Sequence, residues 1–190
     1  MPEGPQIEPA SRQAWRAWLE SHPDRTGGVW FVYAKKAAPA SMPRVAVSDA
    51  IEEALCFGWI DSVPRRLDEH RAMLWFSPRK PGSGWSRPNK ERIARLEAAG
   101  QMHARGRAVI DAAKADGSWT LLDAVENLEV PDDLAAAFAR YPGSAAQWEA
   151  FPRSAKRGML EWVVQAKREP TRAKRVEAIA EAASRGERAY

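Results

Sequence analysis

Two short runs of β-branched and aromatic residues lie close together in WIDSVPRRLDEHRAMLWFS, residues 59–77. The first run is Trp59–Val63, and the second is Met73–Ser77. A charged turn around Asp68 and Glu69 separates them. Runs of this kind, bounded by polar turn residues, are typical of β-strands. We therefore expect an antiparallel hairpin over this stretch.

The residues before the hairpin predict one more strand and two helices. VWFVY, residues 29–33, has strand composition and follows a Gly-Gly turn. A short helix is expected from Ser11 to about His22, because apolar residues recur there at helical spacing. A second helix is expected to start at a capping pair, Asp49 and Glu52, and to end at Gly58. Residues 1–10 contain three prolines and predict a loose arm.

Beyond residue 84 the pattern becomes helical. The expected helices span residues 86–100, 105–116, 131–140, 145–151, 155–167 and 171–184. The segment 119–122 fits a strand or a loop equally well. The predicted fold class is α+β, with a small antiparallel sheet flanked by helices and followed by an all-helical C-terminal region. The expected domains are an α+β core over residues 1–125 and a helical region over residues 126–190.

Positive charge is concentrated in the middle of the chain. The 190 residues carry a formal net charge of +4, yet residues 61–107 contain eleven basic and five acidic side chains. Such a cluster favours an anionic partner. The alternative is that arginine and alanine are abundant because the coding sequence is rich in G and C. The single cysteine, Cys56, permits no intramolecular disulfide, and no signal or membrane segment is recognised, so a cytoplasmic location is expected.

The segment PRKPGSGWSRPN, residues 78–89, has the composition of an anion-binding site. Glycines allow backbone N–H groups to converge, and a helix start leaves several of these donors unpaired. Charged groups and neutral hydrogen-bonding groups are both present, from Arg79, Lys80 and Arg87 and from Ser83, Ser86 and Asn89. The lysine spacing of a P-loop is missing. The alternative is a plain glycine turn with a serine cap and solvated arginines.

Three tryptophans, Trp59, Trp75 and Trp85, are candidates for an apolar pocket beside this segment. Trp59 and Trp75 lie in predicted strands, where core packing is the competing interpretation. Trp85 lies in a loop between glycine and serine. Its ring either packs against the start of the following helix or contacts a ligand.

The sequence gives little support for catalysis or for metal binding. Asp61 could act as a general base, but a carboxylate among arginines is more often an ion-pair partner. Cys56 could be a nucleophile, but a cysteine on a helix face is more often a small buried residue. The three histidines lack metal-binding spacing. A second basic run, residues 167–175, could contact phosphates or could be a solvated turn between helices.

Several fragments together resemble one known family. They are GVWFVYAKK at 28–36, EALCFGWIDS at 53–62, FSPR at 76–79, SGWS at 83–86 with Asn89, and the late segment 166–175. The chain is similar to the YdeI/OmpD-associated family, also called bacteriocin-protection proteins. The resemblance implies a bacterial cytoplasmic protein in bacteriocin, antimicrobial-peptide or envelope-stress protection, with an indirect link to an outer-membrane porin. It implies no catalytic mechanism and no cofactor.

The sequence therefore favours a binding protein over an enzyme. The expected function is non-catalytic binding of a small anionic ligand, without a metal or cofactor and without membrane insertion. The expected ligand-binding residues are Lys35, Lys36, Trp59, Asp61, Arg79, Ser83, Trp85, Ser86 and Asn89. Two alternatives stay open. One is a nucleic-acid-binding protein that uses both basic runs, and the other is a small hydrolase or transferase that uses Asp61 or Cys56.

Overall fold

A computed structural model describes residues 2–189 of the chain. Their contacts form two compact units. The N-terminal unit contains the residues up to Ser83 together with Pro88–Ser118, and the C-terminal unit contains Gly84–Arg87 together with the residues from Trp119 onward. The domain boundary at residue 126 that the sequence favours stays a prediction. Each unit is described by itself below.

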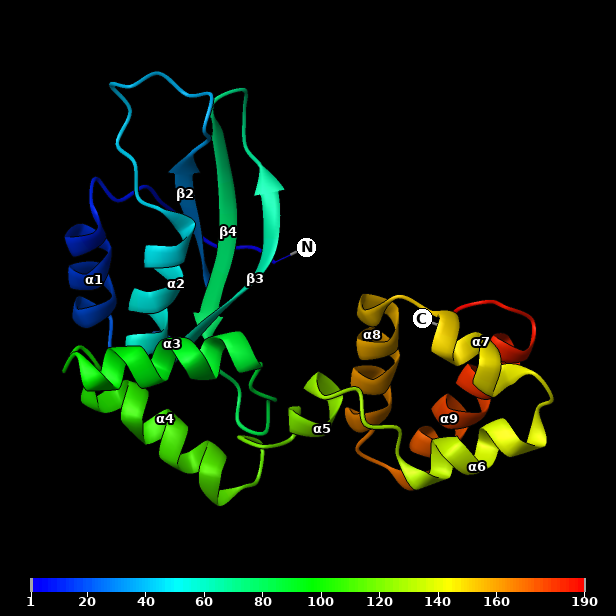
Figure 1. Ribbon diagram of the computed structural model, residues 1–190. Coiled ribbons are helices and arrows are strands. Elements are labelled where there is room, and N and C mark those ends of the chain that lie inside the picture. Colours follow the sequence, from blue (N-terminus) through cyan, green and yellow to red (C-terminus); the bar gives the residue numbers. More distant parts are fainter. Residues whose placement is uncertain (1, 190) are drawn as a thin grey trace. The chain divides into compact units, whose positions relative to one another are not determined.

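The N-terminal unit is built on a four-stranded sheet with the order β1-β2-β4-β3 (Figure 1). Its strands are β1 (Gln6–Ile7), β2 (Val29–Ala34), β3 (Trp59–Arg66) and β4 (Arg71–Pro78). β2, β4 and β3 pair antiparallel, which confirms the three predicted strands. β1 pairs parallel to β2, so the sheet is mixed. The N-terminal arm is therefore not loose, because Trp30 N–H donates to Pro5 carbonyl at 2.9 Å.

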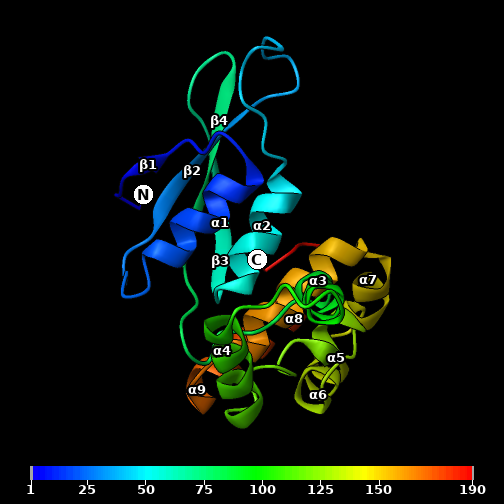
Figure 2. The same ribbon diagram turned by 90° about the vertical axis from the view of Figure 1, so that its left-hand side faces the viewer.

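Two helices, α1 (Arg12–Ser21) and α2 (Val47–Cys56), cover one face of the sheet (Figures 1 and 2). Trp15 of α1 is fully buried and its ring lies 5.1 Å from Phe31 of β2 and 5.6 Å from Phe76 of β4. Ser11 caps α1 by accepting a hydrogen bond from Ala14 N–H. The expected cap of α2 is wrong: the helix begins at Val47 without a side-chain cap, and Asp49 instead faces Arg12 of α1 at 3.4 Å.

The opposite face of the sheet holds a second, smaller core. Trp30 and Val32 of β2 pack there against Met73 and Trp75 of β4. The rings of Trp30 and Trp75 meet edge to face at 5.1 Å. The N-terminal arm covers this cluster, because a Cβ placed on Gly4 would lie 2.7 Å from the Trp75 ring. Glycine is therefore required at this point of close approach.

Two further helices complete the N-terminal unit: α3 (Arg87–Ala98), which belongs to it from Pro88 onward, and α4 (Ala104–Ala115). α4 comes close to the end of α2 at Gly106, where a Cβ would lie 2.2 Å from the carbonyl oxygen of Cys56. Gly58 ends α2 with a φ of +76°, in the left-handed region that the sequence led us to expect. The polypeptide can therefore turn directly from α2 into β3.

The C-terminal unit is helical. It contains α5 (Asp123–Glu126), α6 (Asp132–Arg140), α7 (Ser144–Ala150), α8 (Arg153–Val164) and α9 (Glu169–Ser184). The last four confirm the predicted helices to within three residues at each end. Trp148, Leu134, Met159 and Ile179 are among the buried residues of a single core. Residues 119–122 form a turn rather than a strand.

Candidate ligand site

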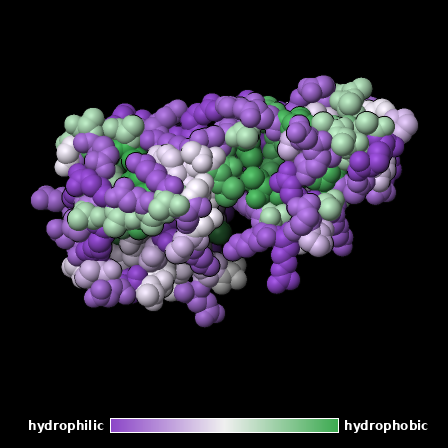
Figure 3. All heavy atoms as spheres, turned by 90° about the horizontal axis from the view of Figure 1, so that it is seen from below, coloured by the Kyte–Doolittle hydropathy of each residue, from purple (hydrophilic) through white to green (hydrophobic). Residues whose placement is uncertain are grey.

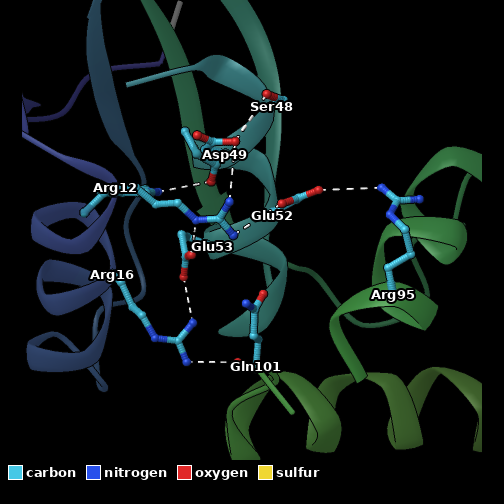
Figure 4. Close-up of polar contacts among 10 residues, drawn as sticks. Arg12, Arg16, Ser48, Asp49, Glu52, Glu53, Arg95 and Gln101 are labelled. Carbon is cyan, nitrogen blue, oxygen red and sulfur yellow. Dashed lines mark hydrogen bonds and ion pairs between the residues drawn. The ribbon is translucent and has the colours of Figure 1, made fainter. Parts of the chain in front are cut away.

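The most connected polar cluster of the N-terminal unit joins α1 to α2 (Figure 4). Glu53 as a whole residue is 4% exposed, and its carboxylate accepts hydrogen bonds from Arg12 Nε at 2.6 Å and from Arg16 Nη1 at 2.7 Å. Arg16 Nη2 also donates to the carbonyl of Gln101 at 2.9 Å. Carboxylate neighbours raise the pKa of both arginines, although burial opposes this. The cluster binds the two helices together through charges that pair with one another.

Cys56 lies at the end of α2 beside this cluster and is fully buried. Burial raises the pKa of the thiol, the negative charge of Glu53 adds to the rise, and Arg16 opposes it. A buried, protonated thiol is a poor nucleophile. The catalytic alternative that relies on Cys56 therefore loses its physical support.

The residues of the 78–89 segment are divided between the two units. Trp85 and Ser86 belong to the C-terminal unit, whereas Ser83 and Asn89 belong to the N-terminal unit. Trp85 is 1% exposed and its ring lies 5.1 Å from that of Trp119. A Cβ on Gly84 would lie 2.7 Å from the Leu122 side chain, so this glycine permits close packing. The loop tryptophan is thus a buried packing residue that belongs to the C-terminal unit.

The polar residues of the segment have internal partners. Ser83 Oγ donates to the Lys80 carbonyl at 2.7 Å and closes a local turn. Asn89 is buried, and its side-chain oxygen accepts a hydrogen bond from Arg92 one helical turn later. Arg87 donates to the side-chain oxygen of Asn127 within the C-terminal unit. These contacts support the interpretation of this segment as a turn and helix start with structural roles.

Lys35 and Lys36 lie at the far end of β2 from this segment. Lys35 N–H donates to His70 carbonyl, and its Nζ donates to the carbonyls of Asp68 and Glu69. Lys36 is exposed. Because strand residues advance about 3.3 Å each, the length of β4 between His70 and Pro78 corresponds to about 25 Å. The two lysines therefore do not join the other expected ligand-binding residues.

Trp59, Asp61 and Arg79, which we call the sheet-end site, lie where β3 begins and β4 ends. Trp59 pairs with Pro78 in the ladder, and Arg79 N–H donates to Gly58 carbonyl at 2.9 Å. Trp59 is buried and meets the ring of Trp18 edge to face at 5.9 Å. Trp75, on the opposite face of the sheet, does not join it. The three tryptophans expected to form one pocket pack in three different places.

Arg79 is the residue of this site with the most unusual electrostatic environment. Burial lowers its pKa from 12.5 to about 10, although the neighbouring carboxylate of Asp61 acts to raise it. The guanidinium remains charged at neutral pH and lies where water solvates it poorly. Arg79 and Asp61 are both half-buried.

The C-terminal unit has two hollows that the sequence did not reveal. A groove of about 270 Å³ is lined by residues of α6 and α9, including Asp133, Arg140, Glu169 and Glu177. Its charges are largely paired within the unit, because Arg172 contacts Asp133 at 2.7 Å and Arg140 contacts Glu177. A smaller groove of about 70 Å³ is apolar, and Val125, Pro131 and Val163 are among its lining residues. Hydrophobic atoms are visible on the surface of this unit in Figure 3.

The second basic run, residues 167–175, is partly engaged in internal contacts. Arg172 binds Asp133 with two nitrogens, at 2.7 and 3.0 Å. Arg175 lies over the ring of Trp162 and donates to its carbonyl. Two of the five cations of the run therefore hold α9 against its neighbours. The run is not a continuous phosphate track.

The cluster around Glu53 was missed by sequence reasoning. Arg12 and Arg16 are four residues apart and so share one face of α1, and Glu53 follows one residue after Glu52 on α2. The spacing was visible, but nothing local indicates that the two helices pack side by side. Among residues 2–189, no group of three or more metal-binding side chains is assembled, and no helix is long and apolar enough to cross a membrane.

Comparisons with known protein families divide the chain in two. Residues 7–109, more than half of the chain, match the model of a domain of unknown function (DUF8412). Residues 127–186 match the model described as bacteriocin-protection, YdeI or OmpD-associated. Most fragments that carried the resemblance, including residues 53–62, lie in the first match, and only the late segment lies in the second.

Searches of curated proteins and of solved structures found no match. The assignment of the chain to known families therefore rests on the two family models. The second match confirms the family suspected from the sequence, although over a shorter stretch than the resemblance covered. Residues 127–186 match the YdeI/OmpD-associated, bacteriocin-protection family suspected from the sequence, and the chain belongs to the family of the domain of unknown function DUF8412, whose model covers residues 7–109.

Proposed function

We propose that this bacteriocin-protection type protein is a non-catalytic binding protein that holds a small anionic or amide-bearing ligand at the sheet-end site. The observation that carries the proposal is the environment of Arg79, whose burial lowers its pKa to about 10 despite the neighbouring Asp61. A cation that water solvates poorly gains more from a bound anion or carbonyl than a fully hydrated one. Binding of such a group would offset part of the free-energy cost of removing the Arg79 guanidinium from water.

The negative charge of Asp61 near Arg79 narrows the ligand class. The guanidinium can donate two parallel hydrogen bonds to a carboxylate or to a carbonyl oxygen. The Asp61 carboxylate repels a second strong negative charge but accepts a hydrogen bond from an N–H group. Small carboxylates that also carry an amide are therefore favoured over phosphates. Trp59, packed against Trp18, supplies a rigid wall on the helix-covered face of the sheet.

Thermal unfolding of the full chain with a small ligand panel tests this proposal. The panel contains acetate, N-acetylglycine, N-acetylglycinamide and inorganic phosphate. N-acetylglycine is expected to raise the unfolding temperature most, and a ligand at a hundred times its Kd adds about 2.7 kcal/mol of stability. Arg79→Ala should remove the shift, whereas Arg79→Lys should retain part of it because the charge remains and the bidentate geometry is lost.

The matched control is Arg87→Ala, in the same segment of sequence. Arg87 donates to Asn127 in the C-terminal unit and is outside the sheet-end site. The control should therefore bind like the unsubstituted protein. If no member of the panel raises the unfolding temperature, or if Arg79→Ala responds as strongly as Arg87→Ala, the sheet-end site is not a ligand site.

A further inference from the structure

Two short segments rich in basic residues, 35–44 and 65–71, form what we call the basic tip. The first segment has three basic and no acidic side chains, and the second has three basic and two acidic ones. Their combined charge of +4 equals the formal net charge of the whole chain. This local excess of positive charge should attract polyanions to the tip.

The two segments are held side by side by their own basic residues. Lys35 Nζ, from the first segment, donates to the carbonyls of Asp68 and Glu69 in the second. Arg44 donates to the carbonyls of Lys35 and Ala38, and these hydrogen bonds within the first segment hold its conformation. In Figures 1 and 2 the tip extends from one end of the sheet, beyond α1 and α2. The structure thus presents charge on a projecting, preorganised surface.

Four cations of the tip are exposed, namely Lys36, Arg44, Arg65 and Arg66. The side chains of Lys36 and Arg65 form no hydrogen bond or ion pair with any residue in the described part of the chain. The carboxylate of Asp68 is occupied by Arg71, which contacts it at 2.8 Å. Asp68 therefore does not neutralise the exposed cations. The tip has charge available for an external partner.

The surface chemistry of the tip distinguishes between classes of polyanion. Val63 is the exposed large hydrophobic residue of the described chain, and it lies outside both segments. Membrane-surface binding normally combines basic residues with apolar side chains that insert among the lipids. Single-stranded nucleic acids are normally held by exposed aromatic rings. A basic surface without either feature fits the phosphate backbone of a duplex.

We propose that the basic tip docks on the phosphate backbone of double-stranded nucleic acid without reading its base sequence. The four exposed cations can contact about four phosphates, for which the slope of log affinity against log salt is about −3.6. This surface lies at the opposite end of the sheet from Arg79, so it does not depend on the proposed ligand site. The second basic run contributes little, because Arg172 and Arg175 already have internal partners.

Fluorescence anisotropy with a labelled duplex of mixed sequence tests the proposal on the full chain. Raising salt from about 25 to about 100 mM should weaken binding by the unsubstituted protein about 150-fold. The double variant Lys36→Gln/Arg65→Gln removes two contacts, so the same change of salt should weaken its binding about 12-fold. The control Lys167→Gln/Lys174→Gln makes the same change in net charge at exposed positions of the C-terminal unit and should retain the original slope.

Several outcomes would overturn the proposal. They are no duplex binding at the lower salt concentration, an unchanged slope in the tip variant, and an equal reduction of slope in the control. Tighter binding to a single strand of the same sequence would also contradict it. Vesicles containing phosphatidylserine form a further arm of the experiment, and stronger retention on them than on the duplex would assign the tip to lipid surfaces instead. Circular dichroism of each variant verifies that the fold is retained.

Discussion

Glu53→Gln is the substitution that should reveal how much the α1–α2 cluster contributes to stability. Each carboxylate oxygen of Glu53 accepts a hydrogen bond from a different arginine, Arg12 or Arg16, at 2.6 and 2.7 Å. The Glu53 side chain is only 6% exposed, whereas the two arginine side chains are 36% and 34% exposed. Glutamine keeps the shape but removes the charge, and it places a donor where one arginine also donates.

The expected loss follows from these contacts. A hydrogen bond to a charged group contributes about 1.5–3 kcal/mol, and breaking a fully buried ion pair costs about 3–5 kcal/mol. Glutamine still provides one acceptor, and Arg12 keeps Glu52 at 3.3 Å. Water also reaches both arginines. We therefore expect a decrease of about 2–3 kcal/mol in the free energy of unfolding, below the value for a fully buried pair.

Urea unfolding followed by circular dichroism measures this quantity, provided that midpoint and m-value are fitted for each variant. The control is Glu97→Gln in the same unit, because Glu97 is 40% exposed and contacts Arg107 at 3.2 Å. An exposed pair contributes about 1 kcal/mol or less. A loss in Glu53→Gln no greater than in Glu97→Gln would show that burial does not strengthen this cluster, and the reasoning would be refuted.

Two further predictions concern packing and pH. Gly106→Ala should lower the free energy of unfolding by more than about 3 kcal/mol, because its Cβ would meet the Cys56 backbone at 2.2 Å. Gly158→Ala, which has open space around it, should instead stabilise α8 by about 1 kcal/mol. Thermal unfolding compares the two variants. Burial acts to raise the pKa of Glu126, but hydrogen bonding and charge from Arg157 outweigh it, so the pKa is lowered. The ionised Glu126 carboxylate should therefore stabilise the fold at neutral pH, and this stabilisation should be lost as the pH falls below its ordinary pKa of 4.5 and the group becomes protonated. Arg157→Met should flatten that part of the stability–pH curve.

Local patterns predicted the elements that depend on local chemistry. The strand at Val29–Ala34 and the hairpin of β3 and β4 were expected from their runs of β-branched and aromatic residues. The left-handed glycine Gly58 correctly indicated the end of α2. Such signals arise from the conformational preferences of a few neighbouring residues, and they survive folding unless a tertiary contact opposes them.

The failures concern contacts between residues distant in the sequence. Asp49 has the spacing of a capping residue, yet it faces Arg12, which is 37 positions earlier. β1 has two residues and no local pattern, and it exists because Pro5 carbonyl meets Trp30 N–H. Trp85 was noted as an unusual loop aromatic, but its burial in the C-terminal unit could not be deduced from its neighbours. For the same reason, the residues predicted to bind one ligand lie in separate parts of the structure.

The parallel pairing of β1 has a consequence for the outer edge of β2. An uncovered strand edge presents a row of N–H and C=O groups that another molecule can extend as a sheet. Residues 6 and 7 occupy part of that row, and the glycine before them lies directly on the Trp75 ring. Removing the first nine residues would uncover both a hydrogen-bonding template and an aromatic surface at once. The N-terminal residues thus shield a strand edge and an indole ring that other molecules could otherwise contact.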